Sequence, residues 1–100
     1  MNIDSKLRLS AQRALLDAVP VGLRAVSIEI KEGMIFLRSI FESQKSKDEH
    51  WESLSIAGIE IISDFPDHKI TEEFLINDDI TQKMKHHKHL VFMRKETDIS

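Results

Sequence analysis

Apolar residues spaced three and four positions apart predict a helix over residues 5–18. They form one stripe along such a helix, while the residues between them are mostly charged or polar. Pro20 and Gly22 follow directly and end the helix, because proline lacks an amide hydrogen and glycine favours a turn. The predicted stripe consists of Leu7, Ala11, Ala14, Leu15 and Ala18.

A second helix is predicted from about residue 46 to residue 65. Ser46 and Glu49 fit a capping box, in which the serine oxygen accepts a first-turn amide and the glutamate reaches back to the serine amide. Pro66 ends this helix. Trp51 lies on the apolar stripe, so we expect it to be a core anchor; the alternative is an exposed tryptophan that acts as an interface hot spot. Gly58 lies on the same stripe and predicts a close approach to the sheet, since glycine costs about 1 kcal/mol of helix propensity relative to alanine.

Four short runs predict β-strands, at residues 23–30, 34–41, 70–76 and 90–94. A break at residues 31–33, containing a glycine, suits a hairpin between the first two strands. The second strand is apolar on both faces, which is typical of a central strand or of a contact patch formed by Phe36 and Ile40. The order α-β-β-α-β-β predicts an α+β fold with a four-stranded antiparallel sheet and both helices packed on one face.

Length and composition indicate one folded domain over residues 1–100, with a core at about residues 5–96 and a frayed C-terminal tail. The chain is 41% hydrophobic and has no cysteine, which excludes disulfides and thiolate zinc sites. The charged N-terminus does not fit a signal peptide, and no apolar run approaches the ~20 residues of a membrane span. We therefore expect a cytoplasmic protein with no membrane contact.

Charge is segregated along the chain. Seven acidic residues and one lysine, Lys69, lie between positions 60 and 79, a formal charge of −6 against −3 for the whole protein. This pattern predicts binding to a basic partner, and a pI near 5.9 disfavours nucleic-acid binding. The acidic residues are Glu60, Asp64, Asp67, Glu72, Glu73, Asp78 and Asp79.

Candidate catalytic and metal-binding groups are few. His86, His87 and His89 lie close together, but adjacent histidines do not point at one ion from regular structure, so we interpret this stretch as a solvated basic loop. Glu72 and Glu73 face opposite sides of a strand and cannot form an acid–base dyad. With no nucleophile elbow and no glycine-rich phosphate loop, we predict no catalytic residue, no metal and no cofactor.

A set of framework segments spans about residues 13–96. The segments are Arg13-Ala14-Leu15-Leu16 with Ala18-Val19-Pro20, Leu23-Arg24-Ala25-Val26-Ser27-Ile28-Glu29, Ile35-Phe36-Leu37-Arg38 with Ile40-Phe41, Ile61-Ile62-Ser63-Asp64-Phe65-Pro66, Glu72-Glu73-Phe74 and Leu90-Val91-Phe92-Met93-Arg94-Lys95-Glu96. Together they resemble small immunity proteins of bacterial contact-dependent growth inhibition (CDI) and similar polymorphic toxin systems. The resemblance implies a protein that binds and neutralises the toxin domain encoded beside it, commonly a nuclease.

The leading hypothesis is therefore a cytoplasmic immunity protein that covers a basic toxin cleft with an acidic surface. The predicted contact residues are Asp64, Asp67, Glu72, Glu73, Asp78 and Asp79, with Phe36 and Ile40 as apolar anchors.

Two alternatives stay open. One is a homo-oligomeric structural or regulatory domain, such as a homodimer, that pairs through Phe36 and Ile40. The other is a small enzyme that uses Asp64 or His68 in a cleft between the second helix and the third strand.

Overall fold

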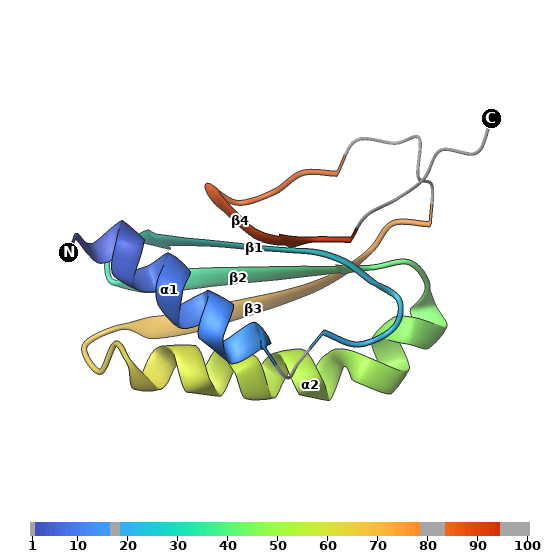
Figure 1. The fold of residues 1–100 in the computed structure, drawn as a ribbon, viewed down its shortest axis with the longest axis horizontal. Coiled ribbons are helices and arrows are strands. Elements are labelled where there is room, and N and C mark those ends of the chain that lie inside the picture. The colour runs from blue at the N-terminus through green and yellow to red at the C-terminus, as the bar shows by residue number, and fades with distance from the viewer. Residues whose placement is uncertain (1, 17–18, 79–83, 95–100) are drawn as a thin grey trace.

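The computed structural model describes residues 2–16, 19–78 and 84–94 and has the predicted order of elements (Figure 1). Helix α1 precedes a hairpin, helix α2 follows the hairpin, and two further strands complete the chain. The elements are α1 (Ile3–Leu15), β1 (Leu23–Lys31), β2 (Met34–Phe41), α2 (Gln44–Ser63), β3 (Lys69–Ile76) and β4 (His89–Met93).

Both helices begin at side-chain caps. The Asn2 side-chain oxygen accepts the Ser5 amide at 2.8 Å, and the Ser43 hydroxyl accepts the Ser46 amide at 3.1 Å. The predicted capping box at Ser46 and Glu49 is therefore wrong: the N-cap of α2 is Ser43, three residues earlier. Ser43 is still extended after β2, so its oxygen meets the free amide three residues on, as an N-cap requires.

The sheet has the strand order β3-β2-β1-β4. Strand β1 pairs antiparallel with β2 through a tight turn, in which Glu32 and Gly33 both have positive φ, and antiparallel with β4. Strands β2 and β3 are parallel, so the prediction of a wholly antiparallel sheet is wrong. The reason is the length of α2. Its 20 residues span about 30 Å, enough to return the chain to the end of the sheet where β2 began.

Side chains from both helices join one buried cluster with side chains from the sheet. In Figure 1, α2 runs below the strands and α1 crosses them, while the segment that leads into β4 lies above the strands. Alternation along β1 and β2 places one set of residues in the cluster, including Val26 and Ile28 from β1 and Leu37 from β2. The opposite set, including Ser27, Glu29 and Arg38, forms what we call the outer face of the sheet.

Candidate functional site

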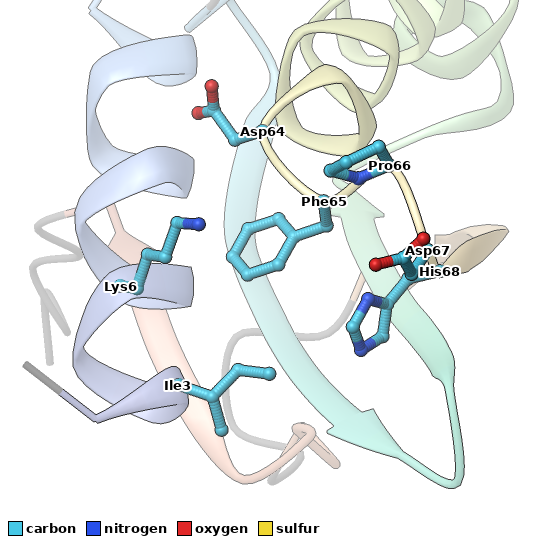
Figure 2. Close-up of a pocket in the computed structure, with 7 residues that line it drawn as sticks. All are labelled: Ile3, Lys6, Asp64, Phe65, Pro66, Asp67 and His68. Carbon is cyan, nitrogen blue, oxygen red and sulfur yellow. The ribbon is translucent and has the colours of Figure 1, made fainter.

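Asp64 and Asp67 flank a hollow between the first turns of α1 and the end of α2 (Figure 2). The hollow has a volume of about 280 Å³ and is lined by Ile3, Lys6, Asp64, Phe65, Pro66, Asp67 and His68. Asp64 follows the last residue of α2, and its carboxylate accepts a hydrogen bond from the Ser10 hydroxyl of α1 at 2.6 Å. Asp67 lies in the exposed loop before β3. Asp64 therefore ties the two helices together, while Asp67 faces solvent.

The titratable groups around this hollow do not converge on one point. In Figure 2 the Phe65 ring occupies the middle of the hollow, with Asp64 and His68 at opposite margins. The Lys6 ammonium lies 5.0 Å from the centre of that ring, and the His68 ring meets it edge-on at 5.7 Å. Catalysis by an acid–base pair requires two groups within hydrogen-bond reach of one reacting atom. Here the Phe65 ring lies between Asp64 and His68, so these two groups do not reach one common atom.

Glu72 lies on the same side of β3 as Phe74, beneath α2. A Cβ atom added to Gly58 would collide with the Glu72 carboxylate, so the missing side chain of Gly58 makes room for it. The sequence expectation of a close approach at Gly58 is met by this contact. Burial raises the pKa of Glu72 above its ordinary value, and a hydrogen bond with Ser55 partly opposes that rise. Glu72 is therefore part of the helix–sheet packing.

Glu73 lies on the outer face, inside a polar network. Its carboxylate accepts a hydrogen bond from the Arg38 guanidinium at 3.0 Å and lies 2.7 Å from Nε2 of His87. The other ring nitrogen of His87 lies 2.6 Å from Glu29, so one imidazole bridges carboxylates from β3 and β1 across β2. Burial acts to raise the pKa of Glu73, but hydrogen bonds from Arg38 and His87 outweigh it and hold this pKa below its ordinary value. Glu73 therefore has a cationic partner, Arg38, and a histidine partner, His87, within its own chain.

The interpretation of the histidine stretch as a solvated loop is wrong. The His87 side chain is 11% exposed, and its amide donates to the buried Ser27 hydroxyl at 2.9 Å. His86 is half-buried, and desolvation together with Arg38 lowers its pKa. His89 lies 3.3 Å from Asp4 of α1. Residues 84–89 therefore pack as part of the fold, because their partners come from strands and a helix far away in the sequence.

The remaining predicted contact residues differ in exposure. Asp78 is exposed just after β3, whereas Asp79 lies outside the described residues. Phe36 is half-buried on the outer face, with its ring 5.9 Å from that of His87. Ile40 is only 3% exposed. Of the two expected apolar anchors, Phe36 offers partial surface and Ile40 offers almost none.

The acidic residues of positions 60–78 do not form one continuous surface in the structure. Asp67 precedes β3 and Asp78 follows it, and eight strand residues at about 3.3 Å each put roughly 25 Å between them. Glu72 and Glu73 point to opposite faces between these ends. Proximity in sequence was misleading here, because a strand separates its ends and alternates its side chains.

The exposed side of α2 carries a surface that the sequence analysis missed. Trp51, Ile56 and Ile59 are 42%, 57% and 63% exposed, so the expectation that Trp51 anchors the core is wrong. Exposed carboxylates surround them on the same helix, at Asp48, Glu49, Glu52 and Glu60. The signal was present in the helical spacing: Ile56 and Ile59 fall off the buried stripe that runs through Leu54, Ala57, Gly58 and Ile61.

No group of three or more metal-ligating side chains occurs within residues 2–16, 19–78 and 84–94. None of the helices in this described part of the chain is long and apolar enough to cross a membrane. The candidate site consists of the exposed surfaces around β3 and along α2.

Comparison with known proteins bears on which kind of surface this is. No curated protein matches the chain. The family model described as MafI2 immunity protein matches residues 4–96, which covers all six helices and strands from the first turn of α1 onward. The match confirms the resemblance to polymorphic-toxin immunity proteins, and the chain belongs to the MafI2 immunity protein family.

Proposed function

We propose that this protein neutralises a cognate toxin domain by binding it directly, through acidic surface, and that it does so in the cytoplasm without catalysing a reaction. The observation that carries the proposal is the family match over residues 4–96. An immunity function requires a stable surface complementary to the toxin, and it requires no reactive group. The exposed carboxylates of α2 and of the loops around β3 supply candidate surface.

The proposed target is a nuclease, whose active cleft must hold phosphates and is therefore basic. An acidic partner gains rate from opposite charge, since electrostatic steering raises the association rate constant well above the neutral range. Covering the cleft would exclude nucleic acid by occupying its site.

The predicted acidic residues divide into two groups for this function. Asp67 and Asp78 are exposed residues outside the helices and strands, so changing them removes no helix or strand contact, and Asp79 lies outside the described residues. Glu72, Glu73 and Asp64 each hold elements of the fold together through Ser55, Arg38, His87 and Ser10. Neutralising this second group would disturb folding as well as charge.

The test uses the toxin domain encoded by the adjacent open reading frame. Co-expression should rescue growth of cells that carry this domain, and the purified proteins should form a complex. In the variant Asp67→Asn/Asp78→Asn/Asp79→Asn, we expect several-fold slower association at low salt, an effect that shrinks as ionic strength rises. Glu32→Gln, in the exposed β1–β2 turn, is the single-charge control.

Two results would count against the proposal. If the wild-type protein neither binds the adjacent toxin domain nor protects cells from it, the toxin-neutralising function is wrong. If binding occurs but association is independent of salt and of the triple substitution, those three aspartates are not contact residues.

A further inference from the structure

We propose that the exposed side of α2 is the surface that docks on the toxin domain. Its centre consists of Ile56 and Ile59, and its margin of Trp51, Asp48, Glu49, Glu52 and Glu60. The partner surface that fits it is basic with an apolar centre. This inference rests on the proposed function, because it takes the toxin domain as the partner, and it specifies which face of the protein makes the contact.

The placement of these residues follows from helical spacing. Residues three, four or seven positions apart share a side of a helix, so Glu52, Ile56, Ile59 and Glu60 follow one another along the solvent side of α2. Trp51 lies at the edge of this side, next to β3. The opposite side is buried against the sheet and α1. The solvent side of a surface helix is typically charged or polar. Here α2 presents apolar side chains on both sides, which marks the exposed side as a contact surface.

Trp51 is held in place before any partner arrives. Its ring meets the half-buried Phe74 ring of β3 edge-on, with centroids 6.1 Å apart and planes 71° apart. Tryptophan is enriched among residues that dominate binding energies. A side chain already fixed by packing loses little freedom on binding, so more of its contact energy contributes to affinity.

The backbone beneath this surface is also fixed. Gly58 lets α2 lie directly over the Glu72 carboxylate, and Leu54, Ala57 and Ile61 fill the core below. The apolar centre therefore sits on an element anchored along its length, not on a loop.

The charge of α2 distinguishes between the possible binding partners of this surface. Beyond Lys47, α2 carries four carboxylates and neither lysine nor arginine. Two copies of the chain docked through this side would bring like charges together, which costs free energy, and nucleic acid or an anionic membrane would be repelled for the same reason. A basic protein surface gains from the same carboxylates. The toxin domain of the proposed function is such a partner.

The mutational test compares two pairs of exposed apolar residues. Ile56→Ala/Ile59→Ala removes the centre of the α2 surface, and Leu90→Ala/Met93→Ala removes apolar residues that are 45% and 46% exposed on β4, at the far edge of the sheet from β3. We expect the α2 pair to weaken binding of the adjacent-gene toxin domain at least tenfold, mainly through faster dissociation. The β4 pair should leave affinity within about twofold. Thermal unfolding of both variants reports whether each folds.

A spectroscopic test leaves the sequence unchanged. Trp51 is the single tryptophan of the chain, so incorporating 5-fluorotryptophan places one fluorine label in the proposed contact. Adding unlabelled toxin domain should shift or broaden this ¹⁹F resonance as the complex forms. An unchanged resonance in a sample where complex formation is seen by sedimentation would overturn the α2 assignment.

The outcomes separate the two proposals. If the toxin binds and is neutralised but the α2 pair retains wild-type affinity, the α2 surface is wrong and the immunity function stands. If the wild-type chain neither binds nor neutralises the toxin, the function itself is wrong. If the α2 substitutions change only self-association of the chain, the surface joins two copies and the assignment to a toxin is overturned.

Discussion

At the residue scale, Gly58 and Glu72 illustrate how one position constrains another across the core. Gly58 weakens the helix that contains it, yet any larger side chain would displace the Glu72 carboxylate beneath it. Glu72 in turn is held there by Ser55, one turn earlier on the same helix, although burial raises its pKa. The glycine and the glutamate are therefore one structural unit.

This pairing predicts a non-additive response to Gly58→Ala. In a Glu72→Ala background the added methyl group meets no carboxylate, so Gly58→Ala should raise the free energy of unfolding by about 1 kcal/mol, the ordinary helix-propensity gain. In the wild-type background the gain should be smaller or absent, because Glu72 must leave Ser55. Urea unfolding of the four proteins in the cycle measures the difference. Equal effects in both backgrounds would show that the two residues do not interact.

At the element scale, the segment before β4 serves as a cover for the outer face of the sheet. His87 reaches carboxylates of β1 and β3, and the Arg38 guanidinium of β2 donates both to Glu73 and to the Lys85 carbonyl, at 3.0 Å in each case. Strand β4, which follows this segment, is therefore positioned by these side-chain hydrogen bonds as well as by its pairing with β1.

This network predicts a pH dependence of stability that belongs to Glu73. Its pKa is lowered in the fold, so its ionised form contributes stability that is fully present above the ordinary value of 4.5 and is lost as pH falls through the folded-state pKa. Glu73→Gln should lower the free energy of unfolding by roughly 1 kcal/mol at neutral pH, because the hydrogen bond from Arg38 then goes to a neutral amide oxygen and not to a carboxylate. The difference from wild type should diminish below pH 4.5.

Urea unfolding of both proteins at a series of pH values measures this difference. Glu32→Gln, an exposed turn substitution, should show a flat and small difference across the same series. A Glu73→Gln effect of constant size down to acid pH would mean that the carboxylate is not held ionised by its partners.

At the scale of the whole molecule, the fold leaves little surface for the homo-oligomer that Phe36 and Ile40 suggested. Ile40 is buried within one copy, and His87 lies beside Phe36. We therefore expect a monomer, with a sedimentation coefficient that stays constant over two orders of magnitude in protein concentration. A coefficient that rises with concentration would favour the structural or regulatory alternative. In that case the Ile56→Ala/Ile59→Ala variant would show whether α2 forms the contact.

Sequence periodicity was sufficient for the order of elements but not for the direction of β3. Spacing rules are local, and they identified α1, α2 and the four strands. The direction of a strand depends on the end of the sheet to which the preceding connection returns the chain. Helix α2 is long enough to run the full length of the strands, so β3 starts at the same end as β2.

The candidate site was predictable only in part for a related reason. The acidic excess of residues 60–79 is real, but β3 spreads it over two ends and two faces. The exposure of Trp51 was not predictable for a similar reason. A residue near the margin of the apolar stripe of a helix is buried or exposed according to which residues of other elements pack against it.

The amino-acid sequence by itself determined which segments become helices and strands, that the chain forms a small α+β domain, and that it resembles immunity proteins. These features depend on local periodicity, composition and framework patterns. Only the tertiary structure decided that β2 and β3 are parallel, that His87 joins two carboxylates, and that α2 exposes an apolar centre among acidic residues. Each of these depends on contacts between residues far apart in the chain, which form only when the segments pack together.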